Sequence, residues 1–313
     1  MQNNLCSALG IAYPIFQGGM AWISDAKLAA AVSEAGGLGV IAAGHAPAEY
    51  VQEQIKLAKS LTKKPLGVNI MLLSPHAEDV AKVLADEEID VIITGAGNPA
   101  KHMETWRHSK IIPVVASTAL AKMMARSGAF AVIAEGAESG GHIGELSTMA
   151  LVPQVSDAVD IPVIAAGGIG DGRGAAAAFM LGAAGIQVGT RFLLATECSV
   201  HRNYKDMVLK AKDIDTIATG KRLGHPVRAL KNTFSREFAK REYDSNISNE
   251  ELEKFGEGAL KRSAIDGDVA SGCFMAGQIS GMLKKEQTAA EIIAEIFTEM
   301  QTQANGVIKQ WAK

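Results

Sequence analysis

The sequence predicts an α/β fold: a (β/α)8 TIM barrel with a helical insertion or subdomain after the eighth strand. The chain has 313 residues, 48% of them hydrophobic, which is enough to bury the core of one barrel or of two ordinary domains. Eight short apolar runs alternate with segments of helical character. Glycine-rich or polar residues follow several of these runs, as expected where the strand ends of a barrel converge on one face.

The eight apolar runs are the candidate strands. Runs this uniformly apolar imply a sheet that is covered on its outer face, and their alternation with helices implies right-handed parallel crossovers. In chain order, the runs are residues 14–17, 38–42, 66–71, 91–94, 112–116, 131–134, 162–165 and 185–188.

Candidate helices lie between the strands, for example at residues 25–35, 47–61, 76–88, 119–127 and 172–181. A doubly wound open sheet would show the same alternation, and periodicity does not separate the two folds. The placement of the polar and glycine-rich runs favours the barrel, because they follow five different strands whose ends meet on one face only if the sheet closes. These runs are residues 17–20, 69–71, 94–98, 135–136 and 167–170.

The alternation ends after the eighth strand. Residues 198–272 are richer in charge and lack convincing strands, so we interpret them as a helical insertion that could serve as a substrate lid. Residues 1–197 would then form the barrel, and residues 273–313 would return to it. Within this last part, residues 288–301 read as the closing helix, with Thr288 as its N-cap and Glu291 completing a capping box.

Composition limits the class of partner and compartment. A formal net charge of -3 and the lack of a long basic block argue against nucleic acid as a partner. The spacing of Cys6, Cys198 and Cys273 suits neither a disulfide framework nor a metal site, which favours a reducing compartment. We see no signal sequence and no apolar stretch near the roughly 20 residues that span a bilayer. We therefore expect a cytoplasmic protein without a membrane partner, and a homodimer as the common default.

Two glycine-containing loops predict a phosphate site. Residues 165–172 follow the seventh strand, and Gly189 and Thr190 follow the eighth. In barrels these two loops commonly bind phosphate through exposed backbone N–H groups and a helix amino terminus. Neither loop matches a Walker or dinucleotide fingerprint. The sequence therefore indicates a cofactor that carries a phosphate.

One histidine stands in a glycine-rich loop after the sixth strand. The loop covers residues 134–144, and its glycines remove neighbouring side chains while leaving the imidazole of His142. We expect His142 to transfer a proton or orient the substrate, with Glu135 and Glu138 either as its partners or as ligands of a hydroxylated group. Asn69 ends an apolar strand and would need a polar ligand.

Metal chemistry is not predicted. The remaining histidines lack the spacing of metal ligands, so we expect no catalytic transition metal. They are His45, His76, His102, His108, His201 and His225.

Four segments carry a resemblance to a known family. Residues 14–22, 67–72, 135–144 and 275–278 resemble the flavin-dependent enoyl-acyl-carrier-protein reductases (FabK type) of type II fatty acid biosynthesis, within the nitronate monooxygenase-like superfamily. The resemblance covers nearly the whole chain. It implies an FMN-containing oxidoreductase of lipid metabolism that uses NADH or NADPH to reduce trans-2-enoyl thioesters to saturated acyl thioesters, with enoyl-acyl carrier protein as substrate.

The resemblance also implies roles for particular residues. The catalytic residue would be His142, on the substrate side, where it donates a proton or a hydrogen bond to the thioester. Gly18, Gly19 and Met20 would lie along the isoalloxazine, and Asn69 and Glu135 would meet polar parts of the flavin. Residues around the ribityl phosphate would be Gly140, Gly141, Gly167, Gly168, Gly189 and Thr190, and the cofactor-binding set would also include Thr94, Met275 and Gln278.

Two alternatives stay open. A nitronate monooxygenase would share the fold and FMN but would use His142 as a base on a nitroalkane; the reductase is favoured because the matches extend into residues 69–75, 94–99 and 275–278. A non-catalytic flavin-binding or phosphate-binding regulator is a further class, since barrels host many functions.

The insertion contains a basic segment that could form a docking patch for an acidic carrier protein. A solvated helix face or contacts to NADPH phosphates would explain the same charges. The segment contains Lys221, Arg222, Arg228, Lys231, Arg236 and Lys240.

Overall fold

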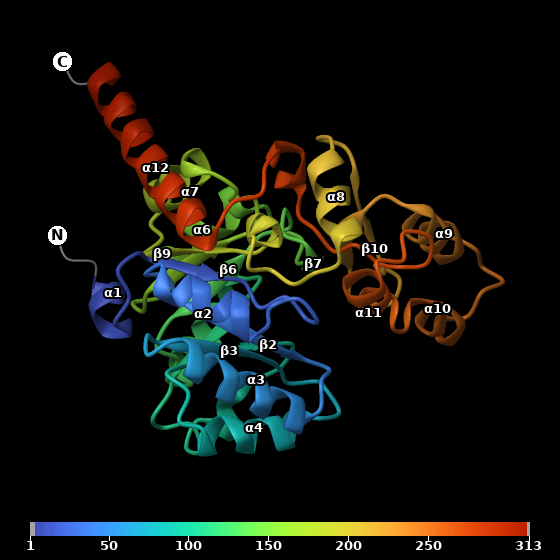
Figure 1. Cartoon of the computed structure of the whole chain (residues 1–313), viewed down its shortest axis with the longest axis horizontal. Coiled ribbons are helices and arrows are strands. Elements are labelled where there is room, and N and C mark those ends of the chain that lie inside the picture. Colours follow the sequence, from blue (N-terminus) through green and yellow to red (C-terminus); the bar gives the residue numbers. More distant parts are fainter. Residues whose placement is uncertain (1–3, 312–313) are drawn as a thin grey trace.

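The computed structural model describes residues 4–311 and shows the predicted barrel (Figure 1). Eight parallel strands form one sheet in the order β1-β9-β8-β6-β5-β4-β3-β2. A parallel bridge between Phe16 and Leu38 joins the first and last strands of this order and closes the ring. All eight predicted strands are confirmed, as β1 (Ile15–Gln17), β2 (Gly39–Gly44), β3 (Leu66–Met71), β4 (Val91–Gly95), β5 (Lys110–Val115), β6 (Val132–Glu135), β8 (Val163–Ala166) and β9 (Gly185–Val188).

A buried side chain supports the closure of the ring at β1, which has only three residues. The side-chain oxygen of Gln17 accepts the Val40 N–H of β2 at 3.1 Å, and its amide nitrogen donates to Ser24 at 2.7 Å. Gln17 is fully buried. Its side chain therefore adds a hydrogen bond between β1 and β2, beyond the backbone bridge of Phe16 with Leu38.

Helices cover the outside of the barrel. The five named in advance are confirmed, and Thr148–Ser156 is an additional helix that the sequence did not reveal because Pro153 lies inside it and proline normally interrupts a helix. Inside the barrel, Leu5 and Leu9 of α1 (Asn4–Leu9) pack with strand residues and close its amino-terminal end. The outer helices are α2 (Ala26–Glu34), α3 (Ala48–Leu61), α4 (Ala77–Asp86), α5 (Thr118–Arg126), α6 (Thr148–Ser156) and α7 (Gly172–Met180).

The closing helix α12 (Ala289–Trp311) extends beyond its predicted end at residue 301. Its capping box is confirmed, because Glu291 accepts the Thr288 N–H at 2.8 Å and Thr288 accepts the Glu291 N–H at 3.2 Å. It packs along α7, where Glu299 accepts the Gly172 N–H at 2.9 Å (Figure 1). Within residues 4–311, no helix is long and apolar enough to cross a membrane.

The segment between β9 and α12 projects from one side of the barrel (Figure 1). It contains the expected helices, with bounds α8 (Arg202–Lys210), α9 (Thr233–Glu242), α10 (Asn249–Gly256) and α11 (Ala259–Lys261). The prediction that it lacks strands is wrong. Strands β10 (Thr216–Thr219) and β11 (Val227–Leu230) form an antiparallel sheet with β7 (Gly141–His142), which comes from the loop that holds the candidate catalytic histidine.

The sequence concealed this small sheet for a physical reason. Strands of four residues are too short to show an alternating pattern, and one of their partners lies in a glycine-rich loop about 85 positions earlier in the chain. The insertion also has its own core, formed by Phe234, Phe238, Leu252 and their neighbours.

Candidate active site

Three polar side chains point into the barrel near the carboxyl ends of its strands: Asn69 of β3, Gln187 of β9 and Glu135 of β6. In β3 and β9, the glycines two positions before Asn69 and Gln187 face the interior, because a Cβ on Gly67 would lie 3.2 Å from Val40 and one on Gly185 would lie 2.9 Å from Leu5. Both contacts belong to the interior core. Side chains alternate along a strand, so Asn69 and Gln187 face inward as well.

Glu135 faces inward by the same alternation, since Ile133 belongs to the interior core. Burial raises the pKa of Glu135 to about 7, against the opposing effect of the Ser139 hydroxyl. The side-chain oxygen of Gln187 is buried and has no partner within residues 4–311. The floor of the site is therefore a set of amide and carboxyl groups suited to a ligand with its own donors and acceptors.

The loop after β1 lies directly on this floor. A Cβ on Gly19 would lie 2.4 Å from the Asn69 Cβ, so only glycine allows this approach. A Cβ on Gly18 would lie 3.3 Å from the Gly189 Cα, and one on Gly189 would lie 3.8 Å from the Met20 sulfur. The structure thus brings together Gly18, Gly19, Met20, Asn69 and Gly189.

The two predicted phosphate loops also lie together at this end of the barrel. Gly167 and Gly168 have φ angles of 92° and 71°, which favour glycine. Among the described residues, the backbone N–H groups of Gly168, Ile169 and Gly189 have no acceptor. These donors could hold an anion.

One helix amino terminus near these loops does not contribute free N–H groups. The amino terminus of α7 cannot bind a phosphate with its first N–H groups, because they are already bonded. Asp171 accepts from Arg173 at 3.0 Å and from Gly174 at 3.2 Å, and Glu299 accepts from Gly172. The partial positive charge of this helix end is matched by protein carboxylates.

The segment after the insertion packs against the histidine loop. A Cβ on Gly140 would lie 2.6 Å from backbone atoms of Ala276, and the Met275 sulfur lies 3.7 Å from the Cβ position of Gly141. The Gly277 N–H donates to the Thr190 hydroxyl at 2.9 Å. Gln278 joins the loop through its backbone, whose N–H donates to the Glu138 carbonyl at 2.9 Å, while its side chain is exposed.

His142 belongs to β7, which lies between the barrel and the insertion (Figure 1). It is exposed and pairs with Val227 of β11, and the adjacent Ile143 N–H donates to the Pro226 carbonyl at 3.0 Å. Desolvation by the surrounding protein, followed by the charges of His225 and His45, lowers the pKa of His142. The ring of His225 lies 6.2 Å from that of His142. The neutral imidazole therefore predominates at pH 7.

Two predicted residues take other positions. The carboxylate of Glu138 accepts the Thr148 N–H at 2.9 and 3.0 Å and caps α6, so it is neither a partner of His142 nor a free ligand. Thr94 is buried on the same side of β4 as Ile92, which packs beneath the outer helices. Its side chain therefore does not join those of Asn69 and Glu135 on the barrel floor.

Gln187 is a site residue that sequence reasoning missed. The sequence could have identified it, because a side-chain amide in a buried apolar strand needs a hydrogen-bond partner, as was noted for Asn69.

The two buried cysteines give no competing chemistry at neutral pH. Burial raises the pKa of Cys198 to about 11 and that of Cys273 to about 12, so both remain thiols.

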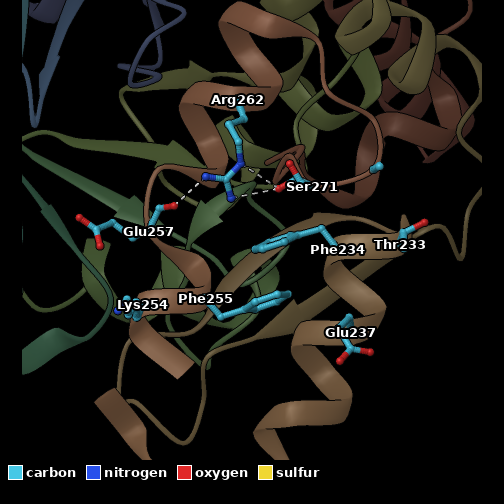
Figure 2. A pocket seen from close by; sticks show the side chains of 9 residues that line it. Thr233, Phe234, Glu237, Lys254, Phe255, Glu257, Arg262 and Ser271 are labelled. Carbon is cyan, nitrogen blue, oxygen red and sulfur yellow. Dashed lines mark hydrogen bonds between the residues drawn. The ribbon is translucent and has the colours of Figure 1, made fainter. Parts of the chain in front are cut away.

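A separate hollow of about 420 Å³ lies in the insertion (Figure 2). Its walls include the stacked rings of Phe234 and Phe255, whose centroids are 5.2 Å apart. The guanidinium of Arg262 donates to the backbone carbonyls of Glu257 and Ser271 (Figure 2). Arg262 therefore stabilises the insertion itself, whereas the residues of the candidate site gather at the barrel mouth.

Comparisons with known proteins agree with this arrangement. A solved structure, FabK from Thermotoga maritima, superposes with a TM-score of 0.96 and 45% sequence identity over 99% of each chain. A probable nitronate monooxygenase from Staphylococcus aureus is 30% identical over 96% of this chain and 97% of that protein.

A third relative, from Rhodococcus jostii, is (3aS,4S,5R,7aS)-5-hydroxy-7a-methyl-1-oxo-octahydro-1H-indene-4-carboxyl-CoA dehydrogenase. It is 38% identical over 74% of this chain and 66% of that protein. The family model described as nitronate monooxygenase matches residues 2–87 and 78–299. Because that model covers most of the chain, the protein belongs to the nitronate monooxygenase family of flavin-dependent oxidoreductases.

Proposed function

We propose that the protein is an FMN-dependent enoyl-acyl-carrier-protein reductase that uses NADH or NADPH. The observation that carries this proposal is a glycine-lined site with a polar floor, joined by the segment around Ala276 and Gly277 to the loop that bears His142. The similarity to FabK over 99% of the chain supports the same reaction. The Rhodococcus relative is named for a CoA-linked substrate, which supports thioesters as a substrate class.

The residues at the barrel mouth fit FMN. The free N–H groups of Gly168, Ile169 and Gly189 would hold its phosphate, and Gly18 and Gly19 leave room for a flat ring against Asn69. When bound, FMN would accept a hydride from NADH or NADPH and deliver it to the β-carbon of the enoyl thioester.

His142 supplies the polar chemistry of the reduction. A neutral imidazole retains one N–H, which can donate a hydrogen bond to the thioester carbonyl oxygen as negative charge develops there. For the α-carbon to be protonated, the imidazole would give up this proton and take one from solvent at its other nitrogen, so that the ring stays neutral. The pairing of β7 with β11 fixes the backbone from which this ring extends.

The basic segment offers less docking surface than its charge count suggests. Three of its six side chains are bonded within the protein: Arg222 to four backbone carbonyls, Arg228 to Ala137, and Lys231 to Ile214. The exposed cations that remain for an acidic carrier protein are Lys221, Arg236 and Lys240. A homodimer remains a prediction, which sedimentation would test.

Anaerobic stopped-flow absorbance tests the proposed reaction. The protein is reduced with NADH or NADPH and mixed with crotonyl-CoA or an enoyl-acyl carrier protein. Rapid flavin reoxidation by the thioester is expected, with a loss of roughly 10²- to 10⁴-fold in the His142→Gln variant that still contains flavin. A reduced flavin that neither thioester reoxidises would contradict the proposal.

Nitronate monooxygenase is the second candidate function. The same neutral state of His142 favours it, because an unprotonated imidazole can act as a base on a nitroalkane. The family model and the Staphylococcus relative support it as well. Turnover of a nitroalkane in air, together with reduced flavin that is inert to thioesters, would favour this candidate.

A further inference from the structure

We infer that Arg228 is a positioning residue for His142. Arg228 lies on β11, where its guanidinium binds the base of the loop that carries His142 while its backbone pairs with the tip of that loop. The inference rests on the proposed role of His142 in the reaction and deepens it, because it names the side chain that keeps the imidazole in one place.

The histidine loop, residues 137–146, is closed at its base and paired at its tip. At the base, the Ala137 N–H donates to the Leu146 carbonyl at 2.8 Å. At the tip, β7 pairs with β11. The base follows β6 of the barrel, whereas the tip pairs with a strand of the insertion. A link between base and tip would therefore fix how far His142 stands from the barrel.

The side chain of Arg228 makes that link. Its Nε donates to the Ala137 carbonyl at 3.0 Å, and its Nη1 donates to the Thr216 hydroxyl of β10 at 3.1 Å. A guanidinium is planar and presents its donors in a fixed fork, so these two bonds set its orientation. Arg228 thus connects the base of the histidine loop to both β10 and β11.

The guanidinium acts on His142 through the backbone rather than by contact. Val227 pairs in register with His142, so their side chains share one face of the small sheet. Side chains alternate along a strand, which places the side chain of Arg228 on the opposite face. The charges that act on the pKa of His142 are those of His225 and His45. Arg228 therefore positions the histidine and is not itself a catalytic residue.

Charge supports the hold of Arg228 on the loop. Burial lowers the pKa of Arg228, and the charge of Glu138 opposes this effect. Glu138 follows Ala137 directly in the loop, and its carboxylate caps α6 through Thr148. The guanidinium is therefore attracted to the same part of the loop whose carbonyl it binds.

Two variants and a matched control test the inference in the full-length protein. Arg228→Met removes the charge and both donors but keeps a long side chain, whereas Arg228→Lys keeps the charge without the fork. The control is Arg262→Met. The Arg262 guanidinium also donates to backbone carbonyls, but these belong to Glu257 and Ser271, outside the histidine loop.

Hydrogen exchange of backbone amides measures the hold on the loop without turnover. The Ile143 N–H, next to His142, donates to the Pro226 carbonyl at 3.0 Å. We expect its exchange to become roughly tenfold faster in Arg228→Met, the effect of one lost hydrogen bond, and to change less in Arg228→Lys. Exchange of Ile143 in the control variant should match the native sequence.

Stopped-flow absorbance then separates the two half-reactions. Reduction of the flavin by NADH or NADPH uses no proton from His142 in the proposed reaction, so Arg228→Met should not change its rate. Reoxidation by crotonyl-CoA should slow by roughly ten- to hundredfold, because a displacement of about 1 Å has an effect of this size. In a His142→Gln background, Arg228→Met should have no further effect, since a positioning residue acts only through the group that it positions.

Three results would overturn the inference: unchanged exchange of Ile143 in Arg228→Met, equal slowing of both half-reactions, or additive effects of Arg228→Met and His142→Gln. If Arg228→Met does not fold, Thr216→Val replaces it, because this change removes one acceptor of the guanidinium and keeps the size of the side chain. Exchange of Ile143 must then still become faster. A native protein whose reduced flavin is inert to thioesters would reject the proposed reaction, while the exchange of Ile143 would still decide whether Arg228 holds the loop.

Discussion

Replacing Glu135 by glutamine should stabilise the flavin-free protein in alkaline solution but not in acid. Burial raises the pKa of this carboxyl from its ordinary value of 4.5 to about 7. This difference corresponds to about 3 kcal/mol, at roughly 1.4 kcal/mol for each pH unit. Above pH 7 the folded state therefore carries a buried charge that the glutamine variant lacks.

The direction of the pH dependence follows from proton binding. Between about pH 4.5 and pH 7, the folded state holds a proton on Glu135 that the unfolded state has lost. The free energy of unfolding therefore falls as the pH rises through this window and stays lower above it. At about 2 °C per kcal/mol for a chain of this size, Glu135→Gln should unfold about 6 °C higher than the native sequence at pH 8.

Thermal unfolding followed by circular dichroism at pH 5 and pH 8 measures the effect. The matched control is Glu138→Gln, which should lose stability at pH 8 because its carboxylate caps α6 through Thr148. If Glu135→Gln differed from the native sequence by the same amount at both pH values, the reasoning from burial would be refuted.

Three further predictions follow from contacts in the structure. Gly140→Ala should lower the free energy of unfolding by about 3 kcal/mol and reduce bound flavin, because the new Cβ would lie 2.6 Å from the backbone of Ala276. Thermal unfolding measures the effect, and the control is Gly306→Ala, whose Cβ would have no neighbour within 4 Å. His225→Gln should raise the pKa of His142 by removing the electrostatic effect of the His225 imidazole, and an unchanged midpoint in an NMR titration would contradict this. Thr288→Ala should lower the free energy of unfolding in urea by about 1 kcal/mol, because the N-cap of α12 is lost. An unchanged free energy of unfolding would show that Thr288 does not cap the helix.

The barrel could be predicted from the sequence because its strands are buried on both faces. Apolar runs such as residues 66–71 and 185–188 carry that signal within a few adjacent residues, and the structure confirms both as β3 and β9. The proximity of Gly19 and Asn69 could also be expected, since Gly19 follows β1 and Asn69 lies near the carboxyl end of β3, and these ends converge in a closed barrel.

The features that the sequence did not reveal depend on contacts between distant residues. Whether Glu138 faces the ligand or caps a helix depends on where Thr148 lies, and the bonding of the α7 amino terminus depends on Glu299 from the end of the chain. Gln187 was overlooked for a different reason, because its strand was judged by its apolar neighbours. An isolated polar residue in such a strand marks a binding site as clearly as a glycine-rich loop does.

The two-residue pairing of β7 with β11 has a consequence for how this fold can acquire new reactions. The barrel supplies the glycine-rich loops of the candidate site from its own strand ends, whereas the backbone position of His142 depends on a strand that comes from outside the barrel repeat. Natural variation in that outside segment could change the position of His142 while the glycine-rich loops stay constant. Grafting the insertion of one relative onto the barrel of another is therefore a direct route to exchanging activities in the laboratory.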